Sequence, residues 1–305
     1  MRGFKEITRV VFSVNKLLGK GFVKRYLEIS RDKNSFLCVG VDPVTEAIRS
    51  RYTVPPQMVK EMGESRAIKE FCIRIIEASI PFAPVIKPNA QFLLYPLCFD
   101  DMKEIVDAIH GGDSLALLDV KLSDIGTTMD AGLHWIDRLG FDAVTFNPFP
   151  GYNNGVDAVY RWAQRRGKGI FALCRMSNPG THDYQSRIMD GEKFYKRLAI
   201  DAHLHGSNGY VVGCTASEEL GEVREIIGED GLILAPGLGA QGGDPVTALR
   251  LGVNSIGEGL IVSSSRSIDY AYEELRWDWR RFGEASAVMA ERVRDQLNEV
   301  RAKLR

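Results

Sequence analysis

The sequence predicts an α/β fold, a (β/α)8 TIM barrel, and three observations support this prediction. Short apolar segments alternate with longer segments of helical period, an order that produces a parallel sheet. Eight such apolar segments can be counted, and eight strands close a barrel of this kind. The length of 305 residues fits one barrel as a single domain.

The predicted strands follow one another at regular intervals, and each is a short apolar run. They are expected at Phe36–Val41, Phe82–Ile86, Leu115–Asp119, Ala143–Phe146, Gly169–Cys174, Gly209–Gly213, Ile233–Ala235 and Ser255–Ile256. The segments between them have the apolar spacing of amphipathic helices. These helices are expected at Ser65–Ser79, Met102–His110, Thr127–Leu139, Val156–Arg166, Lys193–His205, Ser217–Ile227 and Pro245–Leu251.

Both ends of the chain are expected to add helices to the barrel of residues 36–305. The segment Met1–Phe22 is basic, and its helical spacing continues to Ile29 without a small-residue cleavage signal. We therefore interpret residues 1–35 as a helical extension packed on the barrel and not as a targeting peptide. The polar segment Ser267–Arg305 is expected to form one or two solvated helices.

The composition excludes several classes of protein. The chain is 45% hydrophobic and 26% charged, with a formal net charge of -1, which is typical of soluble globular proteins and gives no indication of nucleic-acid binding. No apolar run is long enough to span a bilayer. Five scattered cysteines predict buried reduced thiols, hence a reducing compartment and a cytoplasmic location.

Polar residues follow four consecutive predicted strands. Asp42 follows the first, Lys87 and Asn89 the second, Asp119 and Lys121 end the third, and Asn147 follows the fourth. The active sites of (β/α)8 barrels lie where the strands end, so these groups are expected to converge on one mouth. A single exposed charge would need no explanation, but four such strand ends in a row favour a functional site.

The segment Leu117–Thr128 carries the densest group of charges. Side chains alternate along a strand, so Asp119 and Lys121 are expected to point the same way. Asp124 follows where the strand should turn into a loop. Such charges are costly to bury unless they pair or take part in chemistry.

A glycine-rich loop, Pro236–Asp244, follows the seventh strand. Its Gly237-x-Gly239-x-x-Gly242 spacing matches a dinucleotide fingerprint, but that motif belongs in an opening βαβ unit and this one closes the domain. In a barrel, the loops after strands seven and eight commonly bind phosphate. Arg266, after the eighth strand, could contact the same phosphate.

Two further features are less decisive. The loop Arg175–Gly180, which contains Ser177, is rich in turn formers and could equally be a plain turn or a binding loop. The five histidines show no metal-ligand spacing, and we predict no metal site.

These motifs together resemble the orotidine 5′-phosphate decarboxylase family, in particular its longer, bacterial-type branch. The resemblance covers roughly Phe36 to Ala271. It depends on Val39–Pro43, Ile86–Asn89, Asp119–Thr128, Ser177–Gly180, Pro236–Gly243 and Ser264–Ser267. The sequence departs from the branch pattern at Leu122 and Ser123, where a basic residue and glycine are usual.

The resemblance implies a cofactor-free homodimer that converts orotidine 5′-phosphate to UMP in de novo pyrimidine biosynthesis. It implies a catalytic network of Lys87, Asp119 and Lys121, completed by Asp124 of the partner subunit. Thr128 would also reach the partner's ribose. The remaining substrate contacts would be Asp42 to the ribose hydroxyls, Ser177 to the pyrimidine, and Gln241, Arg266, Gly239 and Ser265 around the phosphate.

Two other hypotheses are compatible with the motifs. One is a magnesium-dependent phosphosugar enzyme of the same barrel group, of the ketogulonate-phosphate decarboxylase or hexulose-phosphate synthase type. The other is a phosphate-ligand-binding barrel without catalytic activity, a possibility that the residues at Leu122 and Ser123 allow and the intact Lys121 and aspartates disfavour.

Overall fold

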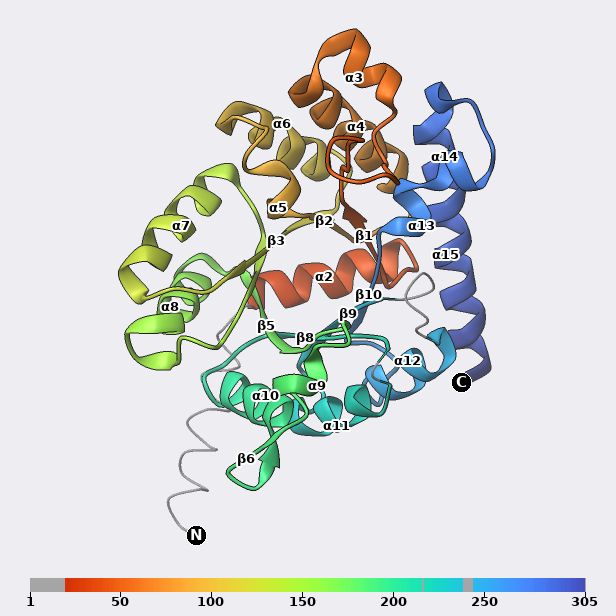
Figure 1. Ribbon diagram of the computed structural model, residues 1–305. Coiled ribbons are helices and arrows are strands. Elements are labelled where there is room, and N and C mark those ends of the chain that lie inside the picture. The colour runs from red at the N-terminus through yellow and green to blue at the C-terminus, as the bar shows by residue number, and fades with distance from the viewer. Residues whose placement is uncertain (1–19, 216, 238–243, 305) are drawn as a thin grey trace.

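Eight parallel strands form a closed barrel, which confirms the predicted fold class (Figure 1). The computed structural model describes residues 20–215, 217–237 and 244–304. The strands lie around the barrel in the order β1-β10-β9-β8-β5-β4-β3-β2. Their bounds are Leu37–Val41 (β1), Val85–Pro88 (β2), Leu115–Leu122 (β3), Ala143–Phe146 (β4), Gly169–Arg175 (β5), Gly209–Val212 (β8), Leu232–Pro236 (β9) and Leu260–Ser264 (β10).

Helices surround the barrel and bury the outer face of its strands. They are α3 (Pro56–Met62), α4 (Glu64–Ser79), α5 (Ala90–Leu93), α6 (Phe99–His110), α7 (Gly126–Leu139), α8 (Asp157–Arg166), α9 (Thr181–Tyr184), α10 (Phe194–Leu204), α11 (Ser217–Ile227), α12 (Pro245–Gly252), α13 (Arg266–Asp269), α14 (Ala271–Glu274) and α15 (Phe282–Leu304). A π-helical turn at Tyr152–Val156, a 3-10 turn at Trp279–Arg281 and an antiparallel hairpin of β6 (Ile188–Met189) and β7 (Glu192–Lys193) complete the described elements.

The eighth predicted strand was wrong. Ser255 and Ile256 lie in a turn in which Ser255 bonds to the Glu229 carboxylate, and the strand β10 begins at Leu260. Gly257 and Gly259 have positive φ, a backbone conformation that separates the turn from the strand. Strand β10 has only three apolar residues, followed by two serines. This composition is typical of a loop, which is why the sequence did not predict the strand.

Several strand boundaries differ from the prediction by one or two residues, and the start of the second strand and the end of the third differ by three. The second strand begins at Val85 and not at Phe82, because Pro84 lacks the N–H that a ladder position needs. The third strand continues past Asp119 to Leu122, so that both charges of the Asp119-Val-Lys121 segment lie within it.

The C-terminal segment beyond Ser267 forms the short helices α13 and α14 and the long helix α15. Helix α15 lies along α4, beside β1 (Figure 1). The rings of Phe71 and Phe282 stack between the two helices, with centroids 5.2 Å apart. None of the helices in the described ranges is both long and apolar enough to cross a bilayer.

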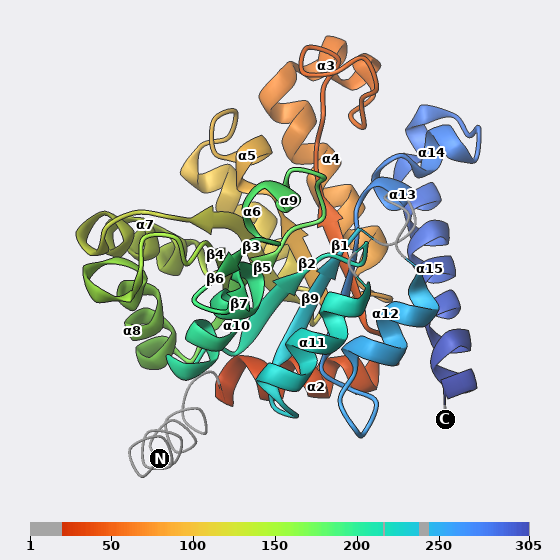
Figure 2. The same ribbon diagram turned by 60° about the horizontal axis from the view of Figure 1, so that its bottom comes forward.

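Helix α2 (Lys20–Asp32) covers the end of the barrel at which the strands begin (Figure 2). Phe22 and Tyr26 are buried in the same apolar cluster as the side chains that fill the barrel interior. The Phe22 ring packs edge-on against Phe171, and the Tyr26 hydroxyl donates to the first carbonyl of β10, at Leu260. The apolar face of the helix therefore closes the barrel core.

A buried acid links the same helix to the barrel. Asp142 accepts hydrogen bonds from the Arg25 guanidinium at 2.7 Å and from the backbone N–H of Ala116 at 2.9 Å. His110 Nε2 lies 2.8 Å from Oδ2 of Asp142. Burial alone would raise the pKa of Asp142, but these partners outweigh it and lower the pKa below its usual value.

Phe22→Ala should lower the free energy of unfolding by about 3–5 kcal/mol, because it removes a ring that fills the base of the barrel. Lys24→Ala, on the exposed face of the same helix, should change it by less than about 0.5 kcal/mol. Urea denaturation measures both. Equal effects of the two substitutions would contradict the assigned role of Phe22.

Candidate active site

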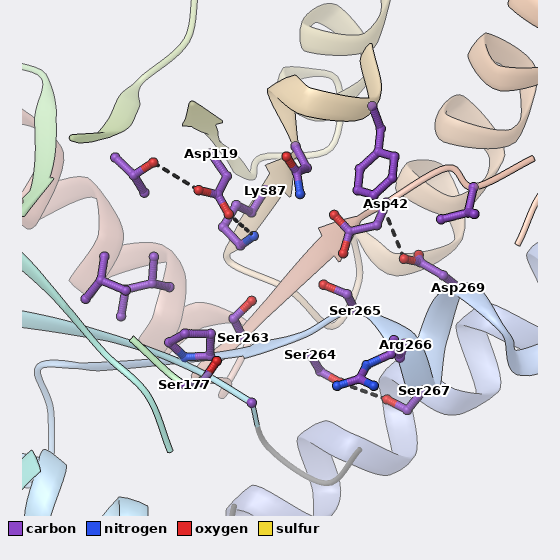
Figure 3. Close-up of a pocket in the computed structure, with 18 of the residues that line it drawn as sticks. Asp42, Lys87, Asp119, Ser177, Ser263, Ser264, Ser265, Arg266, Ser267 and Asp269 are labelled. Atoms are coloured by element: carbon purple, nitrogen blue, oxygen red, sulfur yellow. Dashed lines mark hydrogen bonds and ion pairs between the residues drawn. The ribbon is translucent and has the colours of Figure 1, made fainter. Parts of the chain in front are cut away.

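A cavity of about 490 Å³ opens at the ends of the strands, opposite helix α2 (Figure 3). The predicted convergence of polar strand ends is observed for β1, β2 and β3, whose end residues line this cavity together with Thr145 of β4 and the residues after β10. Asn147, predicted to converge there after β4, is not among the lining residues, and its side-chain oxygen accepts from the N–H of Phe149 at 3.1 Å. Its polar lining comprises Asp42, Arg49, Thr53, Lys87, Asn89, Asp119, Lys121, Thr145, Ser177, Ser263, Ser264, Ser265, Arg266, Ser267, Asp269 and Tyr270.

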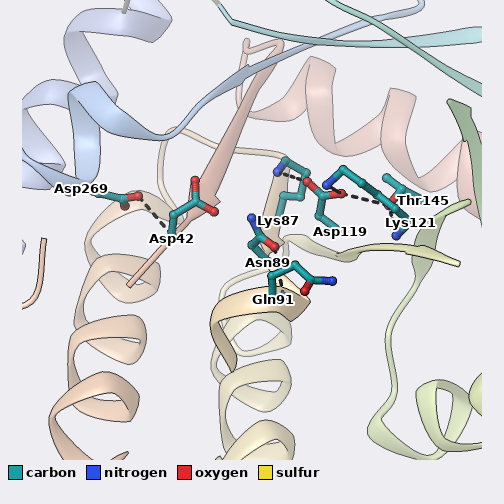
Figure 4. Close-up of polar contacts among 8 residues, drawn as sticks. All are labelled: Asp42, Lys87, Asn89, Gln91, Asp119, Lys121, Thr145 and Asp269. Carbon is teal, nitrogen blue, oxygen red and sulfur yellow. Dashed lines mark hydrogen bonds and ion pairs between the residues drawn. The ribbon is translucent and has the colours of Figure 1, made fainter. Parts of the chain in front are cut away.

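Asp119 is the centre of the polar network in this cavity (Figure 4). The Lys87 ammonium donates to its Oδ2 at 2.8 Å, and the Lys121 ammonium donates to its Oδ1 at 2.7 Å. The Thr145 hydroxyl also donates to Oδ1, at 3.0 Å. Both carboxylate oxygens are therefore satisfied, which makes a buried carboxylate tolerable.

The pairing fixes the charge state of the network. Burial would raise the pKa of Asp119, but the ammonium groups of Lys87 and Lys121 outweigh it and hold that pKa well below its usual range. Burial would likewise lower the pKa of Lys87, yet Asp119 and Asp42 outweigh burial and raise it. Near neutral pH the site thus holds an ionised carboxylate and a buried, protonated Lys87.

Lys121 reaches the network through an unusual backbone conformation. Its φ is +50°, in the left-handed region that a lysine rarely adopts, and the pairing of β3 with β4 shifts register between Leu118 and Leu122. The Lys121 N–H donates to Thr145 Oγ1 at 2.9 Å. Such a conformation costs on the order of 1–3 kcal/mol and persists only where neighbours enforce it, as Thr145 does here.

Asp42 enters the cavity from the end of β1 with one oxygen unsatisfied. Among the described residues, Asp42 Oδ1 is buried and has no hydrogen-bond partner. Its backbone N–H donates to Asp269 Oδ2 at 3.1 Å. A buried acceptor without a donor is costly, and its position in the cavity indicates that a ligand hydroxyl could satisfy it.

Serine and arginine residues after β10 form the other end of the cavity. The hydroxyls of Ser264 and Ser267 lie 2.7 Å apart, and the Arg266 side chain is exposed beside them. Gly40 of β1 is required here, because a Cβ at this position would lie 1.9 Å from Ser265 Oγ. Hydroxyl and guanidinium donors of this kind suit a phosphate. Gln241 and Gly239, predicted to bind the same phosphate, lie outside the described residues.

Ser177 lines the cavity from the loop after β5, and it is half-buried. The loop lies so close to Gly213 that a Cβ there would be 2.9 Å from the Ser177 Cβ. Ser177 is therefore placed where it can contact a ligand in the cavity, and its role in binding stays a prediction.

Asp124 and Thr128 are not part of the cavity lining. Both are exposed, and the Asp124 carboxylate accepts from the N–H of the next residue, Ile125, at 2.7 Å. Asp124 follows β3 and Thr128 lies in the first turn of α7. Neither contacts Lys121 or Asp119 of its own chain in any interaction that the described residues show.

Thr145 and Asp269 line the cavity but were not among the predicted site residues, whereas Asn89 was expected at this mouth and lies there. A signal for Thr145 was present, because its hydroxyl ends a strand next to the Asp119-Val-Lys121 strand. Asp269 is an acid between apolar Ile268 and aromatic Tyr270, a context that signals a buried charge. Within the described part of the chain, no cluster of three histidine, cysteine or acidic residues has the arrangement of a metal site.

Comparisons with known proteins agree with this geometry. The model of the Orotidine 5'-phosphate decarboxylase / HUMPS family matches residues 35–275. The orotidine 5'-phosphate decarboxylase of Azoarcus sp. is 34% identical over 278 residues, which are 89% of this chain and 96% of that protein. That of Dechloromonas aromatica is 35% identical over 272 residues, 87% and 94% of the two chains. The structure of Leishmania donovani OMP decarboxylase superimposes with a TM-score of 0.72 at 25% identity, covering 90% of this chain and 98% of that one.

Thr145→Val should lower the free energy of unfolding by about 1–3 kcal/mol, because it leaves the Lys121 N–H without its acceptor and removes a donor to Asp119. Thr145→Ser keeps the hydroxyl and should recover most of that loss. Chemical denaturation of both variants is the measurement. A serine variant as unstable as the valine variant would show that the methyl group, and not the hydroxyl, matters.

Proposed function

The chain belongs to the Orotidine 5'-phosphate decarboxylase / HUMPS family, and we propose that it converts orotidine 5′-phosphate to UMP and CO2 in de novo pyrimidine biosynthesis. It is then a carboxy-lyase. The observation that carries the proposal is the Lys87–Asp119–Lys121 network, which presents a cation and a carboxylate side by side in a cavity that also offers donors for phosphate.

The reaction breaks the bond between C6 and the carboxylate and leaves the electron pair on C6. No neighbouring carbonyl can delocalise that pair, so the protein must stabilise it by charges that are already in place. Lys121 supplies the cation, because its ammonium is held 2.7 Å from Asp119 and its side chain is 37% exposed toward the cavity. It then transfers a proton to C6 and is reprotonated from solvent.

Asp119 and Lys87 orient that lysine. Asp119 accepts from both ammonium groups and from Thr145, so the carboxylate cannot rotate away. In this arrangement it lies close to the departing carboxylate of the substrate. Lys87, 6% exposed, offsets the negative charge of Asp119 and leaves Lys121 free to face C6. The network needs no metal or organic cofactor, and we propose that the enzyme uses none.

The rest of the cavity fits the other parts of the nucleotide. Asp42 binds the ribose hydroxyls through its unsatisfied oxygen. Ser177 contacts the pyrimidine, and Ser265 and Arg266 bind the phosphate together with Gln241 and Gly239. Binding the phosphate far from C6 orients the ring over Lys121, so that binding energy contributes to the chemical step.

Lys121→Ala should reduce turnover of orotidine 5′-phosphate by more than about 10³-fold, because no other cation faces C6, while UMP affinity changes by less than about tenfold. The absorbance of the substrate and calorimetric UMP binding measure the two effects. Lys69→Ala, which removes a lysine paired on the outer helices, should leave turnover unchanged. Near-normal turnover in Lys121→Ala would refute the assignment, as would loss of wild-type turnover after EDTA treatment, which would favour a magnesium-dependent phosphosugar enzyme.

The protein acts as a homodimer in this proposal, through an apolar face on the helices and loops that follow β2, β3 and β4. The face comprises Tyr95, Phe99, Ile125, Trp135 and Phe149, with Tyr95 87% and Phe149 80% exposed. Phe99 of α6 and Trp135 of α7 are in edge-on contact, 6.0 Å between centroids, so part of the face is continuous. Contiguous exposed aromatic groups are typical of protein interfaces.

Asp124 and Thr128 lie close to Ile125 of this face in the sequence, are exposed, and do not line the cavity of their own chain. In the dimer they complete the site of the partner subunit, where Asp124 extends the charge network and Thr128 contacts the ribose. We further propose a cytoplasmic location, because Cys38, Cys72 and Cys174 are buried free thiols; Cys98, in contrast to the prediction, is exposed.

Co-expression of Lys121→Ala and Asp124→Ala chains should restore turnover to about a quarter of the wild-type value, although each variant alone is inactive. Half of the randomly formed dimers are mixed, and each mixed dimer holds one site with both native residues. Two affinity tags isolate the mixed dimer for assay. A mixed dimer as inactive as its parents would show that Asp124 serves its own subunit.

A further inference from the structure

Two arginines line the cavity without a carboxylate partner among the described residues. Arg49 lies in the loop after β1, and Arg266 begins helix α13 after β10. Both side chains are exposed, so both lie where the cavity opens to solvent. The two cavity lysines differ from them, because they share the carboxylate of Asp119. Arg266 already has a role in the proposed function as a phosphate ligand, whereas Arg49 has none.

The loop that carries Arg49 is held in place by contacts on both sides of it. The Thr53 hydroxyl donates to the carbonyl of Asp42 at 3.0 Å and so closes the loop on the end of β1. The guanidinium carbon of Arg51 lies 4.2 Å from the centre of the Tyr270 ring, and the Tyr270 hydroxyl donates to the Arg51 carbonyl at 3.1 Å. Arg49 lies between these contacts and therefore has a defined position at the opening of the cavity.

Arg49 rests on an aromatic ring and not on an acid. Its guanidinium carbon is 5.7 Å from the centre of the Phe92 ring of α5, which also lines the cavity. An aromatic face attracts a cation without neutralising its charge. Arg51 lies outside the cavity lining, and its guanidinium nitrogens are 3.4 Å from Glu273 and 3.7 Å from Glu274. The loop thus neutralises the arginine outside the cavity and leaves the charge of the arginine at the cavity intact.

An unneutralised charge at the opening acts on a ligand before the two touch. The proposed substrate carries a carboxylate and a phosphate, and the phosphate alone has a charge of about −1.5 to −2 near neutral pH. The attraction extends over about 10 Å at an ionic strength of 0.1 M. Charges of one sign at a cleft raise the local concentration of an oppositely charged ligand and its association rate. A charge at the rim of a binding site mainly changes the association rate and its salt dependence.

We propose that Arg49 captures the anionic nucleotide, which means that its charge draws the ligand into the cavity without a bond that the chemical step needs. The inference deepens the proposed function, on which it rests, by adding a residue that selects anionic ligands. A direct bond between Arg49 and the bound phosphate is the alternative. The two differ in their response to salt, because salt screens a long-range attraction between exposed charges much more than a short bond inside a complex.

Steady-state kinetics of the full protein at two salt concentrations tests the proposal. At an ionic strength of about 0.02 M, Arg49→Gln should lower kcat/KM for orotidine 5′-phosphate by about three- to tenfold and leave kcat unchanged. At about 0.5 M the screening length is about 4 Å, and the loss should shrink to less than about twofold. Arg49→Lys keeps the charge and should resemble the wild type. Arg66→Gln removes an exposed arginine of α4 outside the cavity lining and should leave kcat/KM unchanged.

Calorimetric UMP binding repeats the comparison without turnover and should show a salt-dependent loss of affinity in Arg49→Gln. An unchanged kcat/KM in Arg49→Gln at low salt would overturn the capture role. A loss that persists at high salt, or a fall in kcat, would overturn it in favour of a direct bond. An equal loss in Arg66→Gln would attribute the effect to net charge alone and would also overturn it. A wild-type protein that neither binds UMP nor decarboxylates orotidine 5′-phosphate would instead overturn the proposed function.

Discussion

The buried carboxylate of Asp119 is the group on which the candidate site depends. A single buried ion pair is weak evidence for stability, because desolvation cancels much of the attraction. Two ammonium groups and a hydroxyl donate to Asp119 and satisfy both of its carboxylate oxygens. These hydrogen bonds offset the cost of removing the carboxylate from water. The three partners come from β2, β3 and β4, so the network exists only when three neighbouring strands pair in the correct register. The polar network around Asp119 therefore depends directly on the register of these strands.

The two ends of the barrel have different roles. One end stabilises the fold, and the other holds the groups of the candidate active site. At the end where the strands begin, helix α2 supplies buried aromatic rings and the Arg25–Asp142 pair. At the opposite end, the structure tolerates a left-handed Lys121, unpartnered oxygens on Asp42 and Asp269, and an exposed Arg266. The left-handed backbone and the two unpartnered oxygens are unfavourable for folding. The stability of the well-packed base offsets these costs at the opposite end of the barrel.

The sequence predicted the architecture because alternating apolar strands and amphipathic helices are local patterns. It predicted Lys87, Asp119 and Lys121 at one mouth because parallel strands place their ends together. It failed at Leu260–Ser264, where two of the five strand residues are serines that line the cavity. The hairpin Ile188–Lys193 and helix α3 were missed because they lie outside the barrel repeat, in exposed or loop-like segments. The left-handed conformation of Lys121 has no local signal at all, because it arises from the register shift against β4.

Asp269 shows what local reasoning omits. Its neighbours in sequence suggest only a buried acid, and its partner is 227 residues away. Barrel closure makes β1 and β10 neighbours, so the first and last strands jointly build the part of the cavity that holds Asp42 and Asp269. A motif search treats Val39–Pro43 and Ser264–Ser267 as separate binding segments. In the folded chain, Asp269 follows the second segment by two residues and accepts a hydrogen bond from the backbone N–H of Asp42 in the first. The placement of Asp42 in the cavity is therefore expected to depend on barrel closure, and not on the Val39–Pro43 segment alone.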